Sequence, residues 1–143
     1  LKLAALQRML APPRVFGDET GDLLVVGWGS TKGAIEESVE RLRAEGHKGS
    51  SLHLNFLQPM PGGIKEILGR FKHVLTVEGN WSDRPDDPLI DDTNRRYSAL
   101  AMLLRARYLV DVDCWTETRG RPISPGSICN ELRKRLAREE FRR

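Results

Sequence analysis

The stretch that decides the fold is LLVVGWGSTKGAIEESVERLRAEG, residues 23–46. It opens with a short continuous apolar run, Leu23 to Val26, which is typical of a β-strand buried on both faces. A glycine-rich turn follows, and the turn leads into an amphipathic helix through Arg43 that Gly46 can stop. A buried strand, a tight turn and a helix in this order form the first half of a parallel βαβ unit.

The alternation of strands and helices continues along the chain. We expect a helix over residues 1–10, strands at 50–57, 73–77 and 108–113, and helices over 64–71, 95–105 and from Ser124-Pro125 onward. The inward stripe of the first long helix is formed by Ala34, Ile35, Ser38, Val39 and Leu42. Connections this short favour right-handed parallel crossovers. The order therefore predicts an α/β fold, a three-layer αβα sandwich around a mostly parallel, doubly wound sheet.

The chain reads as one domain, because no repeat or linker divides residues 1–143. It begins at Leu1, inside an amphipathic pattern and without an initiator methionine. We therefore expect a C-terminal fragment of a longer subunit, so that any function found here is a share of a larger one.

Composition excludes several classes of protein. The 23 basic and 20 acidic residues give a net charge of +3, too even a balance for a dedicated nucleic-acid binder. No apolar run approaches the roughly 20 residues that a membrane span needs. The two cysteines, Cys114 and Cys129, match no metal or redox spacing, and His47, His53 and His73 are scattered singly. We expect no metal site, and a cytoplasmic protein with two free thiols.

The turn GWGSTKG resembles a phosphate-binding loop in composition but not in order. A P-loop places its lysine after the last glycine and a hydroxyl after that, whereas here Ser30 and Thr31 precede Lys32. The dinucleotide fingerprint G-x-G-x-x-G would need glycine at the position of Lys32. It also needs an acidic residue at the end of the second strand, where this chain has NFLQPMP.

We therefore interpret the turn as structural. Its glycines permit a positive φ, Gly33 permits close approach of the helix to the sheet, and Ser30 or Thr31 caps the helix. The start of a helix is also a mild anion site, so weak anion binding at Gly29, Ser30 and Thr31 stays open as an alternative.

Other candidate chemistry is sparse. Glu78, Asp111 and Asp113 fall at or near predicted strand ends, where α/β enzymes keep acids and bases. No nucleophile, base or metal set accompanies them, so we expect them to cap helices or bind neighbouring loops. Met60 stands between two prolines and is interpreted as a packed loop residue. No catalytic residue is assigned.

The three tryptophans form a pattern of their own. On the predicted strands, Trp28 follows the first, Trp81 the third and Trp115 the fourth, so all three should lie at one edge of a parallel sheet. Aromatic side chains gathered at one rim are typical of a buried contact surface. With Asn80, they are predicted to dock against the rest of a larger assembly.

Four segments together resemble the alpha subunit of 2-oxoacid:ferredoxin oxidoreductases, particularly the 2-oxoglutarate type. They are DLLVVGWGSTKGAIEESVERLRAEGHK at 22–48, SLHLNFLQPMP at 51–61, HVLTVEGN at 73–80 and RYSALAMLLRARYLVDVDCW at 96–115. Their order and spacing carry the resemblance, which covers roughly Arg14 to Ile128. Many relatives continue V-E-x-N with an aromatic and T-G-Q. Here the run is EGNWSDRPDD, so any role of that T-G-Q is not carried over.

The resemblance implies a domain similar to the C-terminal domain of transketolase. In this family, thiamine pyrophosphate attacks the 2-oxo carbon, carbon dioxide leaves, electrons pass to iron–sulfur clusters and ferredoxin, and the acyl group passes to coenzyme A. The beta subunit mainly holds the pyrophosphate, Mg²⁺ and a [4Fe-4S] cluster, while another alpha domain activates the cofactor. This chain is then expected to bind none of these cofactors. It would serve assembly, its partners being the remaining alpha domains, the beta subunit and, through the complex, ferredoxin, without nucleic acid or membrane.

Two rival interpretations remain open. One is a free-standing nucleotide-binding α/β domain that holds a phosphate at the Gly29–Thr31 turn. The other is a non-catalytic interaction module of unrelated origin. The sequence does not name the 2-oxoacid.

Overall fold

The computed structural model describes residues 2–138. The strands are β1 (Val15–Phe16), β2 (Gly21–Trp28), β3 (Gly49–Leu54), β4 (Phe71–Glu78) and β5 (Asp113–Thr116). The helices are α1 (Lys2–Met9), α2 (Lys32–Ala44), α3 (Ile64–Leu68), α4 (Ala99–Tyr108) and α5 (Pro125–Arg138), with a 3₁₀ turn, η1 (Gly29–Thr31), between β2 and α2.

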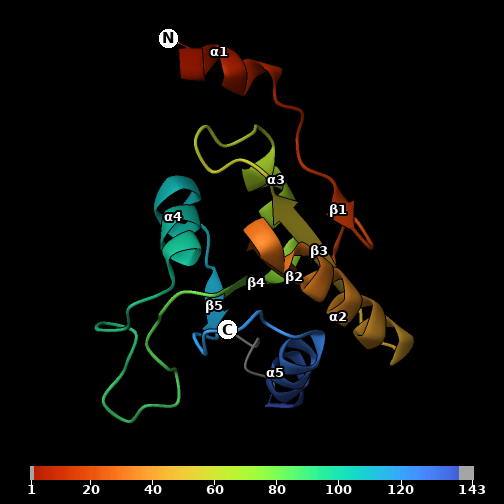
Figure 1. Ribbon diagram of the computed structural model, residues 1–143, viewed down its shortest axis with the longest axis vertical. Helices are drawn as coiled ribbons and strands as arrows, with labels where there is room; N and C mark the ends of the chain where they lie inside the picture. The colour runs from red at the N-terminus through yellow and green to blue at the C-terminus, as the bar shows by residue number, and fades with distance from the viewer. Residues whose placement is uncertain (1, 139–143) are drawn as a thin grey trace.

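The described strands form one sheet in the order β1-β3-β2-β4-β5 (Figure 1). The ladders from β3 through β2 and β4 to β5 are parallel, and Val25 at the centre pairs with Ser51 and Leu75. The two-residue strand β1 is antiparallel to β3 at one edge. A mostly parallel sheet is what the sequence predicts, but a strand as short as β1 carries too little pattern to be foreseen.

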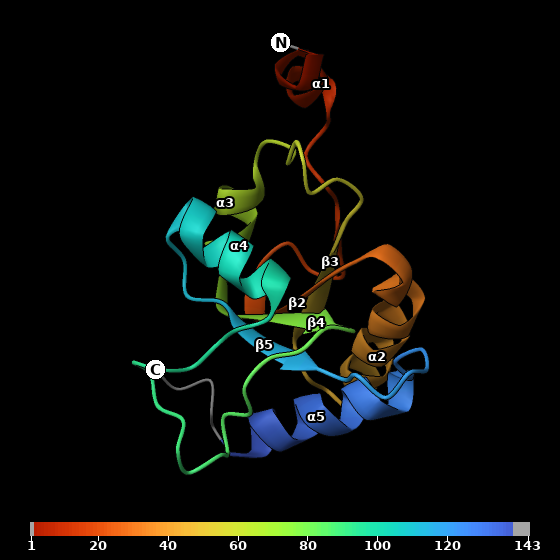
Figure 2. The ribbon, with the colours of Figure 1, turned by 60° about the vertical axis from the view of Figure 1, so that its left-hand side comes forward.

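Helices cover both faces of the sheet, which confirms the predicted αβα sandwich. Figure 2 shows α3 and α4 on one side, and α2 and α5 on the other. One buried cluster joins alternate residues of the strands to α3 and α4: Leu24, Val26, Leu52, Leu54, Ile64, Ile67, Leu68, Val74, Leu100 and Leu104 are among its members. The other joins the remaining faces to α2 and α5: Leu23, Val25, Ile35, Val39, Leu42, Leu75, Val77, Ile128 and Leu132. This division follows from the period of two along each strand.

Helices α2 and α5 pack as their sequences predict, and α5 also begins as predicted. Of the expected α2 stripe, Ile35, Ser38, Val39 and Leu42 are buried. Ser38 Oγ lies 3.0 Å from the carbonyl oxygen of Pro125, which links the two helices. The Ser124 hydroxyl accepts from the backbone N–H of Ser127 at 3.1 Å, so the predicted cap of α5 is confirmed. Gly46 follows α2 with a φ of +92°, the left-handed conformation that glycine adopts without strain.

The prediction of a strand over 108–113 is wrong. Tyr108 is the last residue of α4, Leu109 ends the helix with a φ of +53°, and β5 begins only at Asp113. Leu104 and Tyr108 lie four residues apart and pack against the same core cluster, so the helical period continues into the apolar run. Asp113 therefore stands at the amino end of a strand rather than at its carboxyl end.

The start of α4 and the end of α3 also differ from prediction. The helix expected to begin at Arg95 begins at Ala99, after Ser98 in the extended conformation. The preceding arginines belong to the loop, where ion pairs engage their side chains. The helix expected over 64–71 ends at Leu68, because Gly69 caps it and Phe71 already opens β4.

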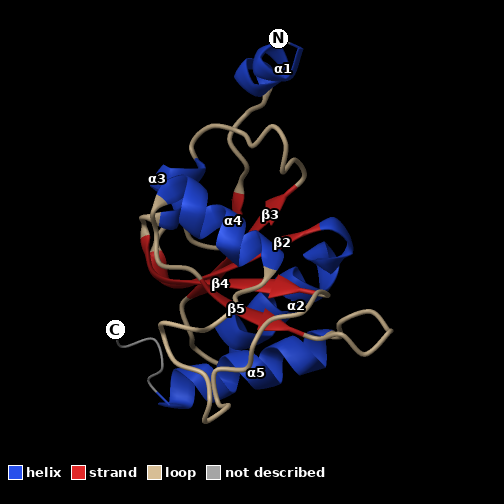
Figure 3. Cartoon of the chain, turned by 90° about the vertical axis from the view of Figure 1, so that its left-hand side faces the viewer, coloured by secondary structure: helices blue, strands red, loops and turns tan. Residues whose placement is uncertain are grey.

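Helix α1 lies apart from the sheet, at the top of Figure 3. None of its residues is buried. A hydrogen bond of 3.1 Å from Gln7 Nε2 to the carbonyl oxygen of Met60 ties it to the loop before α3. Met60 itself is fully buried, as expected of a packed loop residue.

Candidate functional site: the carboxyl edge of the sheet

The glycine-rich turn lies where β2 ends, at the carboxyl edge of the parallel strands. Gly29 has a φ of +61°, which confirms the positive φ expected in this turn. Gly29 and Ser30 are exposed. The Thr31 hydroxyl donates 2.8 Å to the carbonyl oxygen of Trp28 and makes no cap hydrogen bond. The predicted cap by Thr31 is therefore wrong, because the 3₁₀ turn directs this hydroxyl back to the strand end.

The close approach of helix and sheet occurs at Gly27 rather than at Gly33. A Cβ at Gly33 would meet nothing within 4 Å. A Cβ at Gly27 would overlap Ile35 Cδ1 and lie 2.6 Å from Thr31 Oγ1. The assignment of this role to Gly33 is corrected accordingly, since it is at Gly27 that a side chain would crowd Ile35 and Thr31.

The polar groups near the turn are already partly engaged. Lys32 Nζ lies 4.0 Å from Glu36, one helical turn along α2. His53 of β3, which pairs with Gly27, has a buried Nδ1 without a hydrogen-bond partner. Burial lowers the pKa of His53, and the nearby Lys32 lowers it further. The turn thus has a neutral imidazole and a cation shared with a glutamate beside it.

Glu78, at the end of β4, is buried and structural. Both of its carboxylate oxygens accept from the backbone N–H of Leu100 at 3.0 Å, so it caps α4. It also accepts from Trp28 Nε1 at 3.1 Å and from Asn80 Nδ2 at 2.9 Å. The expectation that strand-end carboxylates cap helices is confirmed for this residue.

Asp113 and Asp111 are engaged in ion pairs. Asp113 lies 2.6 Å from Arg95 and also pairs with Arg135, whose side chain is 3% exposed. Burial alone would raise the pKa of Asp113, but Arg135 and Arg95 more than offset this and hold it below its ordinary value. Asp111 is exposed and lies 2.5 Å from Arg105. The sequence did not indicate the two arginine partners of Asp113, which come from segments on either side of it.

Two of the tryptophans predicted for the rim are exposed at this edge. Trp28 is the last residue of β2 and is 41% exposed, and Trp81 follows β4 and is 55% exposed. Trp115 is different, because it lies within β5, in register with Val77. It is partly buried against the cluster of α2 and α5, and its assignment to a loop after the fourth strand is corrected.

Trp81 is held by an arginine that sequence reasoning did not single out. The Arg96 guanidinium carbon lies 4.4 Å from the centroid of the Trp81 ring. Arg96 in turn pairs with Asp83, whose pKa the hydrogen bond from Arg96 lowers. The Asp83 N–H donates to the carbonyl oxygen of Arg96 at 2.9 Å, and the Arg96 N–H donates to Asp83 Oδ2 at 2.8 Å, which closes the long loop at its base. The Arg96 guanidinium thus stacks on an exposed indole, a contact worth about 0.5–1 kcal/mol at an exposed site.

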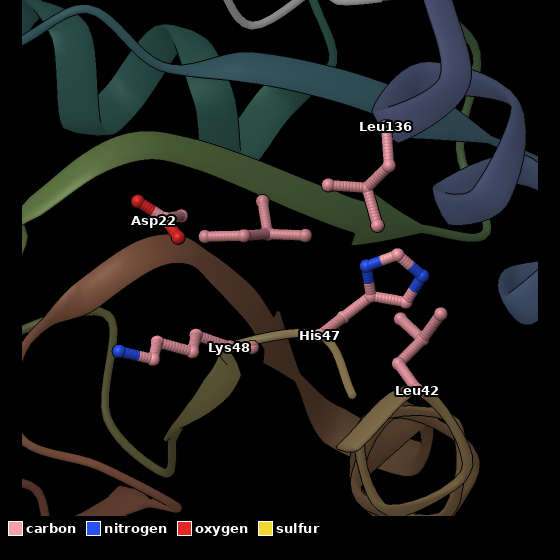
Figure 4. A pocket seen from close by; sticks show the side chains of 7 residues that line it. Asp22, Leu42, His47, Lys48 and Leu136 are labelled. Atoms are coloured by element: carbon pink, nitrogen blue, oxygen red, sulfur yellow. The ribbon is translucent and has the colours of Figure 1, made fainter. Parts of the chain in front are cut away.

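The opposite edge of the sheet holds a small pocket (Figure 4). In Figure 4 the His47 ring lies between Leu42 and Leu136. The cavity volume is about 50 Å³, well short of the roughly 300–1,000 Å³ of ligand sites. Nearby Asp22 is paired with Lys72 at 2.6 Å. The pocket has room for water but not for a nucleotide or thiamine.

The side chains present do not match the ligand set of an iron–sulfur cluster. A [4Fe-4S] cluster takes four cysteine thiolates, and this sequence has two cysteines. The Cys129 thiol donates to the carbonyl oxygen of Ser38, and the Cys114 sulfur accepts from the N–H of Ser98. Within residues 2–138 no three His, Cys, Asp or Glu residues are grouped to hold a metal ion, and no helix is long and apolar enough to cross a bilayer.

Curated relatives, of which one is similar over nearly the whole length, show the family of the chain, although no family model matches. It is 33% identical over 139 residues, 96% of its length, to the 2-oxoglutarate oxidoreductase subunit KorA of Mycobacterium tuberculosis, and spans 19% of that protein. It is 42% identical over 71 residues, 48% of its length, to 2-oxoacid:ferredoxin oxidoreductase 1 subunit alpha of Aeropyrum pernix, and spans 11% of that protein. The chain is a homologue of 2-oxoacid:ferredoxin oxidoreductase alpha subunits. It spans about a fifth or less of these relatives' length.

Solved structures agree with this kinship in fold. A 2-oxoglutarate:ferredoxin oxidoreductase from Magnetococcus marinus, determined with 2-oxoglutarate, coenzyme A and succinyl-CoA bound, superimposes with a TM-score of 0.76 at 24% identity. The match covers 93% of this chain and 21% of that one. A split-gene transketolase, described as an inactive beta4 tetramer, matches at 0.56 with 19% identity, over 87% of this chain and 41% of that one. The alpha-subunit homologue thus has the transketolase C-terminal-like fold that the resemblance implied.

Proposed function

We propose that the chain is a structural and assembly domain of a thiamine-pyrophosphate-dependent 2-oxoacid:ferredoxin oxidoreductase. That enzyme would convert 2-oxoglutarate or a related 2-oxoacid to an acyl-CoA, with ferredoxin as electron acceptor, in the cytoplasm. The single-domain chain would form one part of a longer alpha subunit. Thiamine pyrophosphate, Mg²⁺ and the cluster would be held elsewhere in the complex, and the chain would contact the other alpha domains and the beta subunit.

The observation that supports this proposal is that the carboxyl edge of the sheet has an acidic residue engaged in structural hydrogen bonds and two exposed tryptophans. In an α/β enzyme this edge supplies reactive acids and bases. Here Glu78 is occupied in capping α4 and holding two side chains. Trp28 is exposed and donates a hydrogen bond to Glu78, and Trp81 is exposed and stacks with Arg96. Engaged carboxylates and exposed, anchored indoles are typical of a contact surface rather than of an active site.

We call the surface formed by the exposed Trp28 and Trp81 and the half-buried Asn80 the indole rim. Trp115 was predicted with it but does not belong to it, because it packs against the cluster of α2 and α5, on the other face of the sheet from α4 and Glu78. Gly29, Ser30 and Thr31 adjoin the indole rim directly after Trp28. Their role is proposed to be the turn, since the Thr31 hydroxyl is bonded to the strand end.

Co-purification tests the assembly role. The chain would be expressed within its alpha subunit together with the 2-oxoacid:ferredoxin oxidoreductase beta subunit. Trp81→Ala is expected to reduce the recovered complex at least tenfold, the effect of losing a central aromatic anchor. Met102→Ala is the matched control, because Met102 on α4 is 51% exposed against 55% for Trp81. Equal recovery of the Trp81 and Met102 variants would contradict the proposal.

Activity and ligand binding test the rival interpretations. The 143-residue chain alone is expected neither to decarboxylate 2-oxoglutarate nor to reduce a viologen dye, with or without thiamine pyrophosphate. Calorimetric titration with NAD, FAD, ATP and coenzyme A is expected to give no heat of binding at micromolar concentration. Turnover by the chain, or micromolar binding of a dinucleotide at the Gly29–Thr31 turn, would contradict the assembly role.

A further inference from the structure

Helix α1 has an apolar face that no element of the described residues 2–138 buries. Leu3, Leu6 and Leu10 are spaced by three and four residues, so they lie on one side of the helix. Leu3 and Leu6 are 53% and 37% exposed, and Met9, three residues after Leu6, is 82% exposed. We call the surface formed by Leu3, Leu6, Met9 and Leu10 the leucine face.

The leucine face is not explained by the contacts that α1 makes. Helix α1 has eight residues, none of them in either core cluster, and it stands apart from the sheet in Figure 1. Gln7 bonds to the carbonyl oxygen of Met60, and Pro12 lies against Gly63, where an added Cβ would be 3.2 Å from Pro12 Cβ. These contacts set the position of α1 and leave its leucine face open. Because isolated helices shorter than about 12–15 residues are marginal in water, we expect another part of the protein to cover this face.

The size of the leucine face indicates which kind of partner covers it. One side of this eight-residue helix, about 12 Å long and about 10 Å wide, is on the order of 200 Å². A stable interface between separate proteins buries about 800 Å² on each partner. A domain of the same polypeptide needs less contact area, because the linker makes its association intramolecular. The leucine face therefore fits a covalently linked domain better than a separate subunit.

The alpha-subunit homologues contain enough chain to supply such a domain. The similarity to the Mycobacterium tuberculosis protein covers 96% of this chain, so it includes at least the end of α1. It takes in 19% of that protein, which leaves several times the length of this chain for other domains.

The charges on α1 indicate the chemistry of the covering surface. The helix carries Lys2 and Arg8 and no acidic residue. Neither cation belongs to an ion pair within the described part of the chain. Two copies of α1 packed together would bring only like charges to their contact, which disfavours self-association. An apolar groove with acidic residues at its rim complements both the leucines and the cations.

We propose that the leucine face of α1 docks into an apolar, acid-rimmed groove on a neighbouring domain of the same alpha subunit. This inference rests on the proposed function, because it takes the chain as one part of a longer alpha subunit. The leucine face is distinct from the indole rim: α1 is tied to the loop before α3, whereas the indole rim follows β2 and β4. Helix α1 then joins the domain to its own subunit and leaves the indole rim for the beta subunit.

Hydrogen–deuterium exchange measures whether α1 is covered. The amides of residues 6–10 would be compared between the 143-residue chain and the longer alpha subunit, without the beta subunit. In the 143-residue chain they should exchange rapidly, since a short, exposed helix opens readily. In the alpha subunit they should exchange at least about tenfold more slowly, equally at low and high protein concentration. Equal exchange in the two proteins would overturn the inference.

A pair of substitutions assigns the protection to the leucine face. Leu6→Ser in the alpha subunit should abolish the slow exchange of residues 6–10. Ala4→Ser is the matched control, because Ala4 is exposed and lies about 200° around the helix from Leu6, while serine lowers helix propensity at either position. Protection kept in Leu6→Ser, or lost equally in both variants, would contradict the inference. The comparison of the unmodified proteins gives a result even if Leu6→Ser does not fold.

Other occupants of the leucine face give different results. Protection that rises with the concentration of the alpha subunit indicates a second copy, and protection that requires the beta subunit indicates that subunit. Protection that requires anionic lipid vesicles indicates a membrane surface. Each of these results would overturn the inference. Failure of the assembly role is separate, because Trp81→Ala is measured by recovery of the beta subunit and the exchange of α1 is measured without it.

Discussion

Replacing Asp113 by asparagine should destabilise the domain. The Asp113 carboxylate lies between Arg95 and Arg135, whose side chains are 10% and 3% exposed. The three residues come from the long loop, β5 and α5, so their ion pairs join elements that are distant in sequence. Asparagine keeps the shape and removes the negative charge between two buried cations.

The expected loss in the free energy of unfolding follows from the burial of the two arginine side chains. Removing one partner of a buried ion pair costs about 3–5 kcal/mol, because the remaining charge stays buried without compensation. The Asp113 side chain is 32% exposed, so water screens part of the loss, and Glu131 still pairs with Arg135 at 2.7 Å. We therefore expect a decrease in the free energy of unfolding of about 3 kcal/mol, or about 10 °C in Tm for a domain of this size.

Urea titration and calorimetry of the chain measure this difference. The control is Asp18→Asn, which removes a carboxylate from an exposed pair with Arg43. That variant should unfold within about 2 °C of the parent protein, since exposed ion pairs contribute little. If Asp113→Asn also unfolds within that range, the buried pairs do not stabilise the domain as argued.

The lowered pKa of Asp113 also predicts how the stability of the domain changes at acid pH. Its pKa is lowered in the folded state, so its contribution is fully present above the unfolded value of about 3.9. The contribution is lost as the pH falls through the folded pKa. Between pH 5 and pH 3, the stability of Asp113→Asn should therefore fall less steeply than that of the parent. Parallel curves would contradict the assignment.

Four further substitutions test the turn and the rim. Gly29→Val should lower the free energy of unfolding by about 1–2 kcal/mol. The cost comes from the φ of +61° and not from a clash, since a Cβ at Gly29 would meet nothing within 4 Å. Lys32→Ala should leave the urea midpoint nearly unchanged. Gly27→Ala should cost about 1–3 kcal/mol by overlap with Ile35, again measured by urea titration. Asp83→Asn should loosen Arg96 and shift the Trp81 fluorescence toward that of a free indole, with little change in Tm.

The sequence predicts the central part of the fold because its pattern there is local. The apolar run before Gly27, the helical stripe of α2 and the Ser124 cap each depend on neighbours within a few residues, and each is confirmed. The strand expected over 108–113 fails because Tyr108 continues the helical stripe of Leu104, Leu109 ends α4 in the left-handed conformation, and only Asp113 of this run belongs to a strand.

The candidate site could be predicted only in part, because most of its contacts join segments that are distant in sequence. Trp28 and Trp81 could be placed from the strands before them. The Arg96 ring contact and the bonds of Glu78 to Trp28 and Leu100 join residues about 15 to 50 positions apart, and no spacing rule indicates them. Gly27 and Gly33 look alike in sequence, and only the position of Ile35 shows which one is required to lack a side chain.

Hydrogen–deuterium exchange of the assembled enzyme tests the central proposal most directly. Amide exchange would be compared between the chain alone and the chain within its alpha subunit bound to the beta subunit. The assembly role predicts that amides of residues 28–31 and 79–82 exchange at least tenfold more slowly in the complex, while those of residues 45–48 at the opposite edge do not change. Equal exchange of the rim in both states, with protection elsewhere, would contradict it.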